Sequence, residues 1–79
     1  MNMKILLLEY FSGDKEHYII KSEKGLTSFI KEHIDDEDDV AFIINILLKE
    51  GTYNPTYYNI SGFGGYNYIS LINICGCYA

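Results

Sequence analysis

The spacing of the apolar residues changes along this chain, and that change limits the fold more than any other feature of the sequence. Short β-like runs at the two ends flank a middle part in which apolar residues recur at intervals of three and four. Short apolar or alternating runs are typical of strands, and the wider spacing is typical of amphipathic helices. We therefore expect strands at both ends of the chain and helices between them.

The first part of the chain predicts a β-hairpin. Residues 4–11 are apolar on both faces as far as Leu8, which indicates a central strand covered at least in part on both sides. Residues 12–15 are turn formers, and residues 17–22 resume the strand pattern. His17 is expected to face outward on an edge strand.

Two amphipathic helices are predicted in the middle part, separated by five consecutive acids. The stripe of the first consists of Leu26, Phe29, Ile30, His33 and Ile34. The stripe of the second consists of Val40, Ile43, Ile44, Leu47 and Leu48. Asp39 is the expected N-cap of the second helix, and Lys49 and Gly51 mark its end. Because the second run is also rich in β-branched residues, a strand there stays an alternative.

The last part of the chain predicts a second hairpin, because residues 57–61 and 66–74 flank the glycine cluster 62–65. The predicted fold class is α+β, one small domain over residues 1–79 in the order β-β-α-α-β-β, with a mostly antiparallel sheet and two helices on one face. The inward positions should form one core, made of Ile5, Leu7, Ile20, Phe29, Ile30, Ile43, Ile44, Leu47, Ile69 and Leu71.

The charge balance excludes several classes of function. Eleven acids, six lysines and no arginine give a formal net charge of −5, which opposes direct binding to nucleic acid and to anionic membranes. No apolar run is long enough to span a bilayer, and the N-terminal segment is interpreted as a strand and not as a secretory signal. The expected location is the cytoplasm, which would be the host cytoplasm for a phage-encoded protein.

The sequence contains no pattern that indicates catalysis, a metal or a cofactor. His17 and His33 have no spacing that joins them to a nucleophile. Cys75 and Cys77 are separated by one residue, so they are expected to be free thiols without a disulfide or a metal. The glycine cluster 62–65 lacks the following helix and the Lys-Ser or Lys-Thr pair of a phosphate loop. We therefore expect a protein that is not an enzyme and has no cofactor.

Two features suggest a protein-binding surface. The acid run is interpreted either as a solvated helix start or as a patch that imitates nucleic acid, with Glu32 joining from the preceding turn. A calcium loop fits poorly, because the run is contiguous and lacks a central glycine. Six of the eight tyrosines lie in the last part of the chain among Asn, Ser and Gly, a mixture that suits recognition as well as strand packing. The candidate partner-binding residues are Asp35, Asp36, Glu37, Asp38, Asp39, Glu32, Tyr53, Tyr57, Tyr58 and Tyr66.

The composition, rich in Asn, Ile, Lys and Tyr, together with the short length and acidic balance, resembles that of accessory proteins of phages and mobile elements, among them anti-CRISPR and other anti-defence inhibitors. The resemblance covers no specific residues. It implies a small acidic inhibitor or adaptor that binds another protein, one with a basic groove for nucleic acid. The alternatives are a small-molecule or nucleotide-sensing domain and a small enzyme of another type, and a homodimer stays open.

Overall fold

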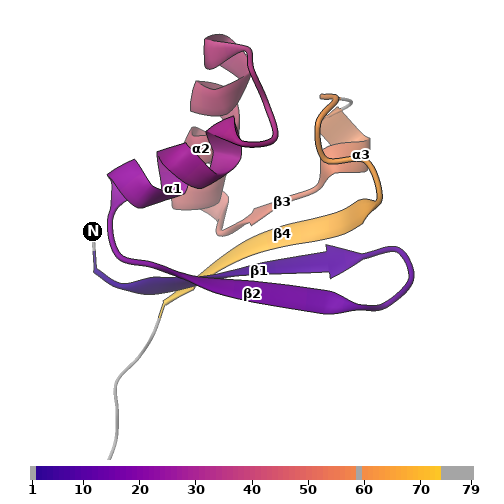
Figure 1. Ribbon diagram of the computed structural model, residues 1–79, viewed down its shortest axis with the longest axis horizontal. Coiled ribbons are helices and arrows are strands. Elements are labelled where there is room, and N and C mark those ends of the chain that lie inside the picture. Colours follow the sequence, from indigo (N-terminus) through magenta and orange to yellow (C-terminus); the bar gives the residue numbers. More distant parts are fainter. Residues whose placement is uncertain (1, 59, 74–79) are drawn as a thin grey trace, which may run out of the picture.

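The computed structural model describes residues 2–58 and 60–73. Within them, a four-stranded antiparallel sheet has the order β2-β1-β4-β3, and helices cover one of its faces (Figure 1). The strands are β1 (Lys4–Tyr10), β2 (Lys15–Ile20), β3 (Thr52–Tyr53) and β4 (Tyr66–Asn73), and the helices are α1 (Glu23–Lys31), α2 (Glu37–Glu50) and α3 (Pro55–Tyr58). The predicted α+β class and the order β-β-α-α-β-β are confirmed, with α3 as an additional short helix.

The first hairpin forms as the sequence predicts, and β1 lies inside the sheet between β2 and β4. In the turn, the Tyr10 carbonyl accepts a hydrogen bond from Gly13 N–H at 3.0 Å, and Tyr10 N–H donates to the Asp14 carbonyl at 2.9 Å. Gly13 has φ of 95°, the conformation of a bulged three-residue hairpin loop. His17 is exposed on the outer strand β2, as expected.

Both long helices begin at a capping side chain. The Ser22 hydroxyl accepts from Gly25 N–H at 3.1 Å at the start of α1. At the start of α2 the Asp36 carboxylate accepts from Asp38 N–H at 2.9 Å and from Asp39 N–H at 3.1 Å. The prediction that Asp39 is the N-cap was wrong, because the helix begins three residues earlier and Asp39 lies in its first turn. The helix ends at the left-handed Gly51, as predicted.

The second predicted hairpin was wrong in its first strand. Residues 52–53, and not 57–61, pair with β4, with Tyr53 opposite Ile69. The segment from Pro55 to Tyr58 is helical because Asn54 and Pro55 give it a helix start, which overrides the strand preference of tyrosine. The chain then returns through the glycine cluster to β4.

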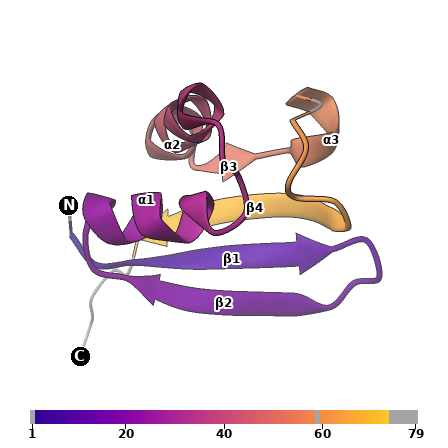
Figure 2. The same cartoon turned by 45° about the horizontal axis from the view of Figure 1, so that its top comes forward.

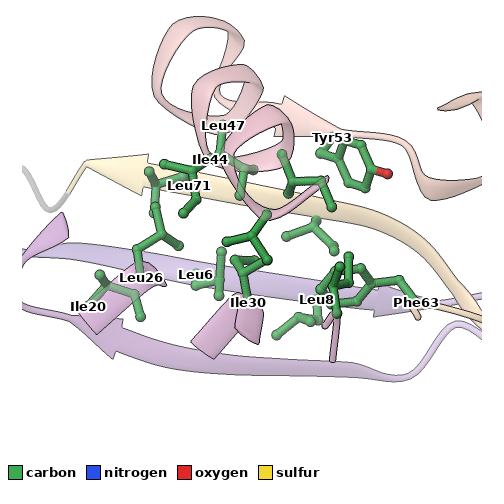
Figure 3. Close-up of a cluster of buried hydrophobic side chains, with 14 residues drawn as sticks. Leu6, Leu8, Ile20, Leu26, Ile30, Ile44, Leu47, Tyr53, Phe63 and Leu71 are labelled. Atoms are coloured by element: carbon green, nitrogen blue, oxygen red, sulfur yellow. The ribbon is translucent and has the colours of Figure 1, made fainter. Parts of the chain in front are cut away.

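The core lies between the sheet and the helices (Figure 3). The fully buried strand residues of β1 are Leu6 and Leu8, so the predicted core positions Ile5 and Leu7 were wrong by one residue. Phe29 is only partly buried against the core. The other predicted core residues are buried, namely Ile20, Ile30, Ile43, Ile44, Leu47, Ile69 and Leu71. Successive side chains of a strand point to opposite faces, so the shift of one residue places Ile5 and Leu7 on the opposite face.

That opposite face, which we call the open face, carries no helix among the described residues (Figure 2). Ile5 lies between Ile19 of β2 and Ile72 of β4, and both neighbours are exposed. Among the described residues, the expectation that β1 is covered at least in part on both sides therefore holds for the helix face only. Within the described residues no helix is long and apolar enough to cross a membrane. Cys75 and Cys77 lie outside the described residues.

Candidate protein-binding surface

An exposed group of aromatic side chains lies where Phe42 of α2 contacts Tyr58 of α3. Tyr58 is its centre, with its ring stacked on Tyr53 at 5.3 Å and in edge contact with Phe42 at 5.3 Å and with Tyr57 at 4.9 Å. The exposed fractions are 42% for Phe42, 77% for Tyr57 and 36% for Tyr58. Large aromatic area that remains in water on a small domain is typical of a surface that contacts another molecule.

The local sequence explains why these tyrosines project from a rigid helix turn. The Asn54 side-chain oxygen accepts from Thr56 N–H at 3.0 Å and from Tyr57 N–H at 3.1 Å. Pro55 is buried at the first helical position, where its missing N–H costs nothing. The cap and the proline therefore fix the turn that presents Tyr57 and Tyr58.

The acid run contributes two carboxylates to the same region. Asp38 precedes Phe42 by four residues on α2 and Asp39 precedes it by three, so all three lie on neighbouring positions of one helix side. The negative charge of Asp39 also acts on the Tyr53 hydroxyl. We call Asp38, Asp39, Phe42, Tyr57 and Tyr58 the acidic–aromatic surface.

Tyr53 supports this surface from below. Its side chain is buried, and its hydroxyl has no hydrogen-bond partner among the described side chains. Burial, followed by the negative charge of Asp39 and by Tyr58, raises the pKa of Tyr53 to about 12. Tyr53 is therefore a neutral packing platform for Tyr58 at physiological pH.

The remaining predicted site residues lie elsewhere. Asp35 is exposed before the N-cap, and Asp36 is engaged in capping. Glu37 faces the groove between α1 and α2. Glu32 lines a groove between β2 and α1, and Tyr66 stacks on Tyr10 at 4.6 Å near the hairpin turn. The fold thus brings together Asp38, Asp39, Tyr53, Tyr57 and Tyr58 and separates the others from them.

Sequence reasoning missed Phe42. Its signal was present, because on a helix Phe42 lies opposite the buried stripe of Val40, Ile43, Ile44 and Leu47. An apolar ring on the exposed side of α2 does not pack in the core beneath the helix, so it can contact another molecule. The pair Asn54-Pro55 likewise signalled the start of α3.

The geometry within residues 2–58 and 60–73 includes no group of three or more His, Cys, Asp or Glu placed to hold a metal ion. His33 packs between Phe29 and Phe63, with ring distances of 5.0 and 4.7 Å, which is a structural environment. Comparison of the chain with protein-family models, with curated proteins and with solved structures gives no match.

Proposed function

We propose that this chain is a small non-enzymatic inhibitor or adaptor, of the anti-defence kind, that binds another protein through the acidic–aromatic surface. The observation that supports it most is the position of Asp38 and Asp39 one helical turn before Phe42, whose exposed ring contacts the ring of Tyr58. Carboxylates attract a basic surface and speed its approach, while aromatic rings supply contact area once water is expelled. The matching partner is a protein with a basic groove built for nucleic acid.

The charge part of the proposal is tested with two matched double variants. Asp38→Asn with Asp39→Asn neutralises the surface, and Glu9→Gln with Asp14→Asn neutralises two acids at the first hairpin. Each changes the formal net charge from −5 to −3, because each removes two negative charges. Asp36 is left unchanged because it caps α2, and losing a cap costs about 1 kcal/mol of stability.

The aromatic part is tested with Tyr57→Ser and, as its control, Phe11→Ser at the hairpin turn, where the ring is 63% exposed. Parent and variants are immobilised and exposed to host-cell lysate, and retained proteins are identified by mass spectrometry. A partner should be lost from the Asp38/Asp39 and Tyr57 variants, kept by both controls, and displaced by heparin, a polyanion that occupies basic grooves. Equal retention by a variant and its control, or retention insensitive to heparin, would contradict the proposal.

A further inference from the structure

The outer strand β2 offers a second surface that the acidic–aromatic surface does not include. β2 is an edge strand of the sheet, and its outer side pairs with no strand among residues 2–58 and 60–73. In antiparallel pairs, residues alternate between those that exchange main-chain hydrogen bonds and those that do not. The bond from Tyr10 N–H to the Asp14 carbonyl fixes this alternation, so Glu16, Tyr18 and Ile20 bond to β1.

It follows that the main-chain N–H and C=O groups of His17 and Ile19 point away from the sheet. Proteins commonly protect such edges with lysine. Here Lys15 begins β2 and Lys21 directly follows it, so the lysines guard only the ends of the strand. Between them Ile19 is 60% exposed. As far as the described part of the chain shows, the middle of the edge is therefore open to pairing with another strand.

A groove of about 390 Å³ runs beside this edge, between β2 and α1. The helix wall of the groove includes Gly25, which has no side chain, and Ser28, which has a small one. Tyr18 and Phe29 also line the groove and pack together at a ring distance of 5.2 Å. Small residues leave room for side chains of an added strand, and the two rings form an apolar contact for one of them. Lys21 also lines the groove.

We propose that β2 and this groove bind an extended peptide segment of a partner protein as an additional strand of the sheet. The segment has apolar residues at its centre, over Tyr18 and Phe29, and an acidic residue beside Lys21. Main-chain bonds to His17 and Ile19 supply register, and alternate side chains enter the groove. A second copy of the chain fits less well, because both copies carry a formal net charge of −5 and would repel each other.

The test uses synthetic peptides of alternating valine and threonine that carry two aspartates at either the N- or the C-terminal end. Amide hydrogen exchange is followed residue by residue by NMR. In the free protein His17 and Ile19 should exchange fast, while Tyr18 and Ile20 are protected by β1. When about nine-tenths of the protein is bound, exchange at His17 and Ile19 should slow roughly tenfold, since only the free fraction still exchanges. A peptide with N-methylated amides should give no protection.

Two substitutions at one position separate main-chain pairing from side-chain contact. Ile19→Pro removes an outward N–H without removing a bond to β1, and it should abolish binding. Ile19→Thr keeps the N–H and should retain binding. Exchange at His17 and Ile19 that stays unchanged with both peptides would overturn the proposal. Protection confined to α2 and α3 would overturn it as well. Protection that rises with protein concentration without peptide would also overturn it, by identifying a second copy as the occupant.

Discussion

Gly62→Ala should destabilise this protein far more than Gly64→Ala, although both glycines belong to the same cluster. Gly62 has φ of 119°, a conformation that costs other residues about 1–3 kcal/mol. A Cβ atom there would lie 2.6 Å from the His33 carbonyl oxygen and 2.8 Å from Ile34 Cγ1. The carbonyl belongs to the backbone and cannot swing aside, so overpacking adds a cost of about 1–3 kcal/mol.

The expected loss for Gly62→Ala is therefore at least about 2 kcal/mol, a large part of the roughly 4–12 kcal/mol typical of a domain this size. At Gly64 a Cβ atom meets nothing within 4 Å, and φ is not positive. That substitution should be neutral or stabilise by up to about 1 kcal/mol, because alanine restricts the unfolded chain. Urea unfolding followed by circular dichroism measures both. Equal unfolding free energies for the two variants would refute the close contact between the cluster and the segment that follows α1.

Two further predictions concern the sheet. Leu6→Ala should lower the free energy of unfolding by about 2–5 kcal/mol, because Leu6 is fully buried. Leu7→Ala on the open face should lower it by less than half as much in the same urea assay. Equal losses of stability would contradict the strand register. Tyr53→Phe should leave stability unchanged or raise it by about 1 kcal/mol, since the buried hydroxyl has no partner among the described side chains. Because burial raises the folded pKa of Tyr53 to about 12 from 10, the unfolded state loses this proton first, so stability falls as pH rises from 10 to 12. Thermal unfolding over that range should show a shallower fall for Tyr53→Phe, and an identical fall would count against burial of the hydroxyl.

The two proposed surfaces lie on different parts of the molecule and recognise different chemistry. The acidic–aromatic surface on α2 and α3 suits a folded basic groove, whereas the β2 edge suits an extended segment (Figure 2). Substitutions at Phe42 and Tyr57 should weaken binding only of the first kind of partner. Ile19→Pro should weaken binding only of the second kind of partner, so these variants assign any captured protein to one surface.

Local patterns in the sequence were enough to predict β1, β2, α1, α2 and β4 in their order, but not β3 and α3. The three- and four-residue spacing of apolar residues produced α1 and α2, and Gly51 ended α2, because these signals act within a few residues along the chain. The acid run and the late tyrosines were also recognisable as unusual. They stand out by composition alone, and composition does not show which of these side chains lie close together in the fold.

Contacts between the elements fixed which residues of β1 face the core and which side chains come together. β1 is apolar on both faces, so its pattern fits either orientation, and packing against α1 and α2 selected Leu6 and Leu8. Any of several neighbouring acids could cap the second helix, and Asp36 is the cap because α2 begins at Glu37. Pairing of β3 with β4 carried α3 to the side of α2, which set Tyr58 against Phe42. These choices depend on contacts between distant segments, and such contacts are absent from any local pattern of residues.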